Sequence, residues 1–99
     1  MSAQLWIDTD ADETIDLGVD GFTLYQVFAE MDHLGGMKRY PQLFGVIEAS
    51  ELQEDVDPAW LAQVRQQASR FLSRYRKRHS PDAVTVLEAL APKDKGEKP

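Results

Sequence analysis

The sequence predicts a small α+β domain in which an N-terminal β-hairpin packs on three to four α-helices. Two short segments near the N-terminus alternate apolar and polar residues, whereas later segments repeat apolar residues at helical spacing. A chain of 99 residues can bury one core and little more. We expect the globular domain to span residues 1–92 and the charged residues 93–99 to form a disordered tail. The alternative is an all-α fold with an irregular N-terminal arm.

The hairpin is predicted from two alternating segments, residues 4–9 and 14–19. The first places Leu5 and Ile7 on one face, and the second does the same for Ile15, Leu17 and Val19. The acidic residues 10–13 form the loop between them. Because an isolated hairpin is barely stable in water, it must pack on helices or gain a third strand.

The first helix is predicted from a capping box, in which Thr23 is the N-cap and Gln26 lies three residues later. Phe22 and Val27 would form a hydrophobic staple across this start. The apolar stripe that follows consists of Leu24, Val27, Phe28, Met31 and Leu34. Gly35 and Gly36 then supply a left-handed stop.

Residues 37–56 give the weakest pattern. Pro41 can begin a short helix that runs through Ile47, or residues 44–47 can form a third strand. We favour the helix, although Gly45 costs it about 1 kcal/mol relative to Ala. Residues 50–56 are expected to form a turn or a single helical turn.

The longest helix is predicted over residues 58–78. Asp57 caps it, Pro58 occupies its first position, and Val56 can form a staple with Leu61. Its apolar stripe is Leu61, Val64, Ala68, Phe71, Leu72 and Tyr75, with Trp60 at the edge.

The last helix is predicted over residues 81–91, because Ser80 and Pro81 repeat the pattern of a cap followed by proline. Its inward residues are expected to be Val84, Leu87 and Leu90, with Pro92 beyond its end.

Charge is divided unevenly along the chain. The net charge is −6, but residues 1–57 hold 13 acids and 2 bases, and residues 58–99 hold 4 acids and 9 bases. In one interpretation the basic helix folds back on the acidic half and neutralises it. In the other, the molecule has two surfaces of opposite sign, one of which steers a partner.

The acidic loop resembles part of an EF-hand calcium loop over about twelve residues, because it places aspartates at every second position. Two positions depart from that pattern. Glu13 stands where the sharp turn needs Gly, and Val19 stands where a bidentate acid is needed. We therefore assign no metal site, and calcium binding remains an alternative that uses Asp8, Asp10, Asp12 and Asp16.

Other catalytic patterns are weak. Glu30 and His33 form one E-x-x-H pair, which di-iron bundles use twice with two further glutamates. Both fall off the apolar stripe, so we interpret them as surface residues. The chain has no Cys, no G-x-S-x-G sequence and no glycine-rich phosphate loop. We therefore predict no enzyme and no cofactor.

The basic helix carries a stripe of Arg70, Arg74 and Lys77 opposite its apolar face, with Gln63, Gln66 and Gln67 nearby. Such a stripe can contact phosphates, but the acidic half of the chain repels nucleic acid. The aromatic residues without an assigned place are Trp6, Trp60, Tyr25, Tyr40 and Phe44. If Trp6 faces away from Leu5 and Ile7, it can anchor an interface.

The function expected from these observations is a non-enzymatic protein-binding module of the inhibitor, immunity or adaptor type, which acts as a monomer or homodimer. The candidate binding residues are Asp10, Asp12, Glu13, Trp6, Arg70, Arg74 and Lys77. Calcium binding through residues 8–16 and nucleic-acid association through residues 58–78 are the alternatives. The lack of Cys and of a signal-peptide pattern favours the cytoplasm, and no apolar run predicts a membrane span.

Overall fold

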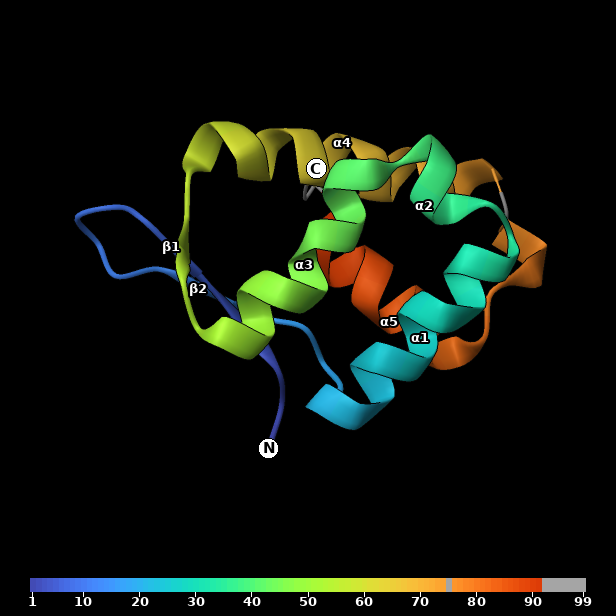
Figure 1. The fold of residues 1–99 in the computed structure, drawn as a ribbon, viewed down its shortest axis with the longest axis horizontal. Helices are drawn as coiled ribbons and strands as arrows, with labels where there is room; N and C mark the ends of the chain where they lie inside the picture. The colour runs from blue at the N-terminus through green and yellow to red at the C-terminus, as the bar shows by residue number, and fades with distance from the viewer. Residues whose placement is uncertain (75, 92–99) are drawn as a thin grey trace, which may run out of the picture.

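The protein combines a small sheet with five α-helices in the computed structural model, which describes residues 1–74 and 76–91. The sheet lies at one end of the molecule and the helices make up the rest (Figure 1). This arrangement confirms the predicted α+β class. The elements are β1 (Gln4–Ile7), β2 (Thr14–Asp16), α1 (Gly21–His33), α2 (Gly36–Arg39), α3 (Pro41–Leu52), β3 (Asp55–Val56), α4 (Pro58–Arg74), the 3-10 turn η1 (Arg76–Arg78) and α5 (Pro81–Leu90).

The sheet has the order β2-β1-β3. The predicted hairpin is confirmed, with Leu5 opposite Ile15 in an antiparallel pair. The third strand is β3, which runs parallel to β1 and pairs Ile7 with Val56. The expected turn over residues 50–56 is therefore wrong at its end. Val56 forms a strand there because it becomes buried while its carbonyl accepts a hydrogen bond from the Asp8 amide, at 2.9 Å.

Helix α1 begins earlier than the capping box predicts. Asp20 is the N-cap, and its Oδ1 accepts a hydrogen bond from the Thr23 amide at 2.7 Å. This backbone N–H, with the Thr23 hydroxyl, holds the pKa of the Asp20 carboxyl below its ordinary value. The predicted cap at Thr23 is therefore wrong. Phe22 lies inside the helix and is 73% exposed, so the predicted staple is wrong as well.

The end of α1 follows the prediction, because Gly35 adopts the left-handed conformation with φ 82°. Gly36 then starts α2 in a crowded place. A Cβ added to Gly36 would lie 2.7 Å from Phe71 Cε2 and 2.8 Å from the Met31 carbonyl oxygen. Glycine is therefore required here by the close approach of α1 and α4 to α2.

Helix α3 confirms the favoured interpretation of the weakest segment and continues past Ile47 to Leu52. Gly45 lies inside this helix, where its missing side chain makes room for Trp60 of α4. A Cβ on Gly45 would lie 2.9 Å from Trp60 Cζ2. The packing of α4 against α3 thus explains a residue that local helix propensity disfavours.

The helix predicted over residues 58–78 ends earlier, because α4 stops at Arg74 and the 3-10 turn η1 begins at Arg76. The two C-terminal helices are capped as predicted. Asp57 Oδ1 accepts from the Ala59 amide at 2.9 Å, and Ser80 Oγ accepts from the Ala83 amide at 3.2 Å. Helix α5 packs against α4, α1 and β2, and its buried residues are Ala83, Val86, Leu87 and Leu90. Val84, expected to face inward, is only half-buried, because the inner face of α5 is turned toward Ala83 and Val86.

The predictions for Tyr75, Pro92 and the tail 93–99 lie outside the described residues. Within residues 1–74 and 76–91, we find no helix that combines the length and apolarity of a membrane span.

Candidate functional site

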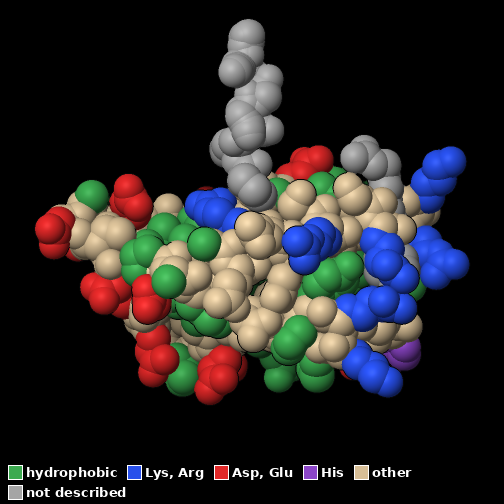
Figure 2. All heavy atoms as spheres, turned by 90° about the horizontal axis from the view of Figure 1, so that it is seen from above, with side chains coloured by type: hydrophobic (Ala, Val, Ile, Leu, Met, Phe, Trp, Pro, Cys, Tyr) green, Lys and Arg blue, Asp and Glu red, His purple; other side chains and the backbone are tan. Residues whose placement is uncertain are grey.

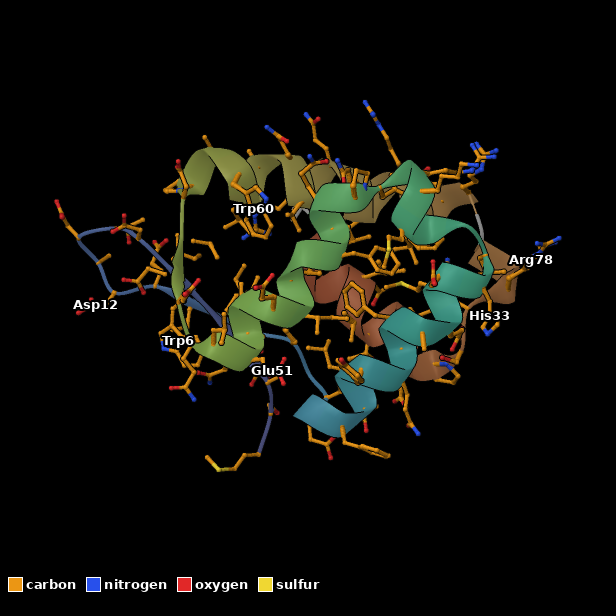
Figure 3. All side chains as sticks on the ribbon, viewed as in Figure 1. Trp6, Asp12, His33, Glu51, Trp60 and Arg78 are labelled. Atoms are coloured by element: carbon orange, nitrogen blue, oxygen red, sulfur yellow. The ribbon has the colours of Figure 1, made fainter. Side chains whose placement is uncertain are left out.

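Charged side chains gather at opposite ends of the molecule. Figure 2 shows acidic side chains over the end that holds the hairpin and basic side chains over the other end. In Figure 3, Asp12 at the hairpin tip and Arg78 in η1 lie at opposite extremes. Asp10, Glu13 and Lys77 are exposed at these same two places. This layout favours the interpretation of two surfaces of opposite sign over internal neutralisation.

The acidic loop does not gather its carboxylates into a cation site. Among the described residues there is no group of three or more His, Asp or Glu side chains that could hold a metal ion. Asp16 Oδ1 instead accepts a hydrogen bond from the Gly18 amide at 2.8 Å, and Thr9 Oγ1 accepts from the Ala11 amide at 3.3 Å. The carboxylates of the hairpin tip are exposed and do not form such a group.

The E-x-x-H pair is divided between a structural role and the surface. Glu30 is half-buried, and its carboxylate accepts hydrogen bonds from the Ser80 amide at 3.0 Å and the Ser80 hydroxyl at 2.8 Å. Because Ser80 is the N-cap of α5, Glu30 ties α1 to the start of that helix. His33 is exposed as expected. The expectation of a surface position is therefore wrong for Glu30. Its partner Ser80 lies far away in the chain, so no spacing pattern in the sequence predicts the contact.

Some polar side chains of the basic helix α4 form hydrogen bonds within the molecule. Arg65 Nη1 donates to the carbonyls of Leu90 and Ala91, at 3.0 and 3.3 Å, and so caps the end of α5. Gln67 Oε1 accepts from the Leu43 amide at 3.0 Å in the first turn of α3. The exposed candidates on this helix are Arg70 and Arg74, which line a shallow hollow beside Tyr40, Ser69 and Ser73.

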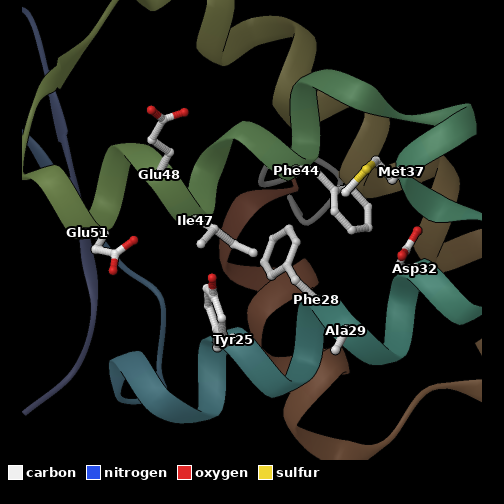
Figure 4. A pocket seen from close by; sticks show the side chains of 9 residues that line it. All are labelled: Tyr25, Phe28, Ala29, Asp32, Met37, Phe44, Ile47, Glu48 and Glu51. Atoms are coloured by element: carbon white, nitrogen blue, oxygen red, sulfur yellow. The ribbon is translucent and has the colours of Figure 1, made fainter.

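An apolar groove of about 380 Å³ lies between α1 and α3. Figure 4 shows Tyr25 and Phe28 of α1 pointing toward α3, while Ile47 of α3 points back toward α1. Met37 of α2 lies at one end. Tyr25 is 62% exposed and Met37 is 51% exposed. The complete lining of this α1–α3 groove is Tyr25, Phe28, Ala29, Asp32, Met37, Phe44, Ile47, Glu48 and Glu51.

The groove exists because α3 is apolar on two sides. Leu43 and Val46 are fully buried in the core, whereas Phe44 and Ile47 are half-buried and turned to the groove. Phe44 packs edge-to-face against Phe28, with ring centroids 5.0 Å apart. This contact gives the groove a floor of packed aromatic rings. Phe44 and Ile47 therefore form a second apolar side of α3 that the chain covers only in part.

A second depression continues the groove toward the sheet. Tyr25, Ile47 and Glu51 line both, and the second also includes Trp6 and the first residues of the chain. Trp6 is half-buried on the face of β1 opposite Leu5 and Ile7, as the alternation predicts. The structure thus brings Trp6 next to the groove, while the hairpin acids and the α4 bases lie at the two ends.

The rim of the groove is acidic. Asp32, Glu48 and Glu51 are exposed, and each charged side chain in the lining is one of these three. Figure 4 shows Glu48 on the α3 ridge, pointing away from the aromatic floor. None of the three carboxylates forms a hydrogen bond or ion pair within the described part of the chain.

Sequence reasoning did not select the residues of this groove as a site. The available signal was an excess of apolar residues: Tyr25 and Phe44 had no assigned place, and the segment after Gly36 had no single apolar stripe. Pairing α1 with α3 needs the tertiary fold, because α2 separates them in the chain.

The fold and the site define a small α+β domain with an open apolar groove and an acidic rim. Comparison with known proteins adds no relative: no family model, no curated protein and no solved structure matches the chain.

Proposed function

We propose that the protein is a non-enzymatic protein-binding module that works by occupying the surface of a partner, as inhibitors, immunity proteins and adaptors do. The observation that carries the proposal is the open apolar groove between α1 and α3, with Tyr25 and Met37 exposed along it. Contiguous exposed apolar surface rimmed by polar residues marks interaction sites in monomeric proteins. Tyrosine and methionine are enriched at such interfaces.

The charge layout supports the same proposal. Charges at the ends of a molecule steer the encounter with a complementary partner and raise the association rate, while the apolar centre provides most of the binding free energy. Asp10, Asp12 and Glu13 at the hairpin tip form one steering end, and Arg70, Arg74 and Lys77 form the other. Trp6 extends the apolar surface from the groove toward the hairpin.

The chemistry of the polar groups agrees with a binding role. Ser80 and Glu30 are hydrogen-bonded to each other at the start of α5, where they join two helices of the fold. The absence of Cys in the chain suits a reducing compartment such as the cytoplasm, which we propose as the place where the module acts.

The proposal is tested by capture from a lysate of the source organism with matched baits. Tyr25→Glu places a charge in the groove, and Phe22→Glu places one on the same helix at an exposed position outside the groove. We expect wild type and Phe22→Glu to retain one stoichiometric protein that Tyr25→Glu loses. Retention of nucleic acid alone, of the same proteins by all three baits, or of nothing would contradict the proposal.

The steering role has a separate measurement once that protein is known. Asp10→Lys with Asp12→Lys should slow association at low salt and leave dissociation almost unchanged, because rim charges act mainly on the association rate. An unchanged association rate would remove the hairpin tip from the binding surface.

A further inference from the structure

The α1–α3 groove is bordered by two helices of similar length. It runs between α1 and α3, which have 13 and 12 residues. At 1.5 Å per residue, α3 is about 18 Å long, which equals about three helical turns. A third helix placed between two others packs its side chains into the furrow that they form. An amphipathic helix laid into an apolar groove is a recurring mode of peptide recognition.

An extended peptide would find few backbone groups to pair with on this protein. Recognition by strand addition needs a free sheet edge with several backbone groups in a row. Here the two edge strands, β2 and β3, have three and two residues. An added strand would therefore form few hydrogen bonds, whereas a helix satisfies its own backbone and needs only the apolar contact.

The charge around the groove favours a bound partner of opposite charge. Among the described depressions, three are lined by residues of α3. Every charged side chain that lines these three is acidic: Asp32, Glu48, Glu51, Glu54 and Asp57. A helix with acidic flanks would be repelled there, and one with Lys or Arg flanks would be attracted.

A second folded copy of the chain does not offer such a helix. Its most amphipathic helix, α4, already buries its apolar face in its own core through Leu61, Val64, Ala68 and Phe71. Helix α5 does the same with four buried residues. The occupant must therefore bring an apolar helix face that is free in the partner.

We infer that the α1–α3 groove binds an amphipathic α-helix of a partner protein, with apolar side chains on the aromatic floor and Lys or Arg side chains along the acidic rim. The inference rests on the proposed function and names the chemistry of the partner. Apolar anchors at positions i, i+3 or i+4 and i+7 of the bound helix would meet Tyr25, Phe44 and Ile47.

The probe is a synthetic, end-blocked peptide of about 14 residues, with Leu at helical spacing and Lys elsewhere, which carries a fluorophore for anisotropy measurements. Two matched peptides accompany it. One has Glu in place of every Lys, and the other has a proline in its centre, which breaks the helix. We expect the Lys peptide to bind at least about tenfold more tightly than either of the others.

Two double variants of the protein locate the site. Glu48→Lys with Glu51→Lys changes the rim, and Asp10→Lys with Asp12→Lys changes the hairpin tip. Each replacement alters the charge by two, so both proteins carry −2 in place of −6. We expect the rim variant to lose at least about tenfold in peptide affinity and the tip variant to lose less than about threefold. Glu51→Gln serves as the milder rim variant if the double variant melts early.

Equal losses for both variants would overturn the inference, since the peptide would then respond to net charge alone. Equal binding of the proline peptide would overturn it as well. Absence of peptide binding, with groove-dependent capture of a protein from the lysate still observed, would reject the helical occupant and leave the proposed module standing. Absence of both would reject both.

Discussion

Two pairs of helices in this protein use apolar residues in opposite ways. Helices α4 and α5 pack directly on each other, and the inner residues of α5 are fully buried, as is Phe71 of α4. Helices α1 and α3 also carry buried core residues, but they leave a groove between them in which Phe44 and Ile47 are half-buried and Tyr25 is exposed. The first pair forms a closed core, and the second forms an open surface.

The difference teaches how to separate stability from binding in a small domain. In the closed pair, each inward residue is matched by a neighbour within the same chain, so its substitution should cost folding free energy. In the open pair, the apolar residues on the groove side have no neighbour above them, so their substitution should cost affinity instead.

Phe71→Ala should give the largest loss. Phe71 is fully buried. It stacks with Tyr40, with ring centroids 5.3 Å apart, and meets His79 edge-to-face at 5.2 Å. Removing the ring should lower the free energy of unfolding by about 3–5 kcal/mol, as measured by urea denaturation. Phe22→Ala, at an exposed phenylalanine, is the control and should change it by less than about 0.5 kcal/mol. Similar losses for both would break the comparison.

Gly36→Ala tests the close contact at the end of the open pair. Its Cβ would meet the Met31 backbone and the Phe71 ring, so we expect a loss of about 1–3 kcal/mol on denaturant unfolding. Gly21→Ala is the matched change, because a Cβ there meets nothing within 4 Å. This control should be neutral or gain up to about 1 kcal/mol. A gain for Gly36→Ala would show that α2 can move without cost.

Glu30 and Ser80 connect the open pair to the closed pair, and a double-mutant cycle measures that connection. Glu30→Ala removes both hydrogen bonds, whereas Ser80→Ala removes only the bond from the hydroxyl, because the amide donor belongs to the backbone. We expect a coupling free energy of about 1 kcal/mol from chemical denaturation of the four proteins. Additive losses would mean that the two residues stabilise their helices independently.

Asp20 makes the start of α1 sensitive to pH. The Thr23 amide lowers the pKa of the Asp20 carboxyl in the folded protein, so its contribution is present above the unfolded pKa and is lost as the pH falls through the folded value. Asp20→Asn keeps a capping side chain without the charge. The melting temperature of wild type relative to Asp20→Asn should therefore fall between pH 7 and about pH 3. A constant difference would argue against the charged cap.

Tyr25→Ala should have the smallest effect on folding. Because Tyr25 is 62% exposed, the free energy of unfolding should change by less than about 0.5 kcal/mol. Affinity for the Lys peptide should fall at least about tenfold in the same protein, as measured by anisotropy. A large loss of stability without a loss of affinity would mean that Tyr25 belongs to the core, and would contradict the description of α1 and α3 as an open surface.

The closed pair was largely predictable from sequence, and the open pair only in part. Asp57 and Ser80 cap their helices as predicted because a cap and its amide lie two or three residues apart. The cap of α1 was predicted at Thr23 because Thr23 and Gln26 complete a capping box, whereas the actual cap, Asp20, depends on where the preceding loop turns. Strand β3 was missed because two residues carry no alternation, and they form a strand only where β1 offers a partner.

By itself, the sequence determined four of the five described helices, most of their buried faces and the division of charge, because these follow from periodicity, caps and composition within short segments. It did not predict α2, which begins at the glycine expected to end α1. The tertiary structure decided which polar residues form hydrogen bonds between elements of the fold, as Glu30, Arg65 and Gln67 do. It also decided that the second apolar side of α3 stays open beside α1. Both outcomes depend on contacts between residues far apart in the chain, which no local pattern encodes.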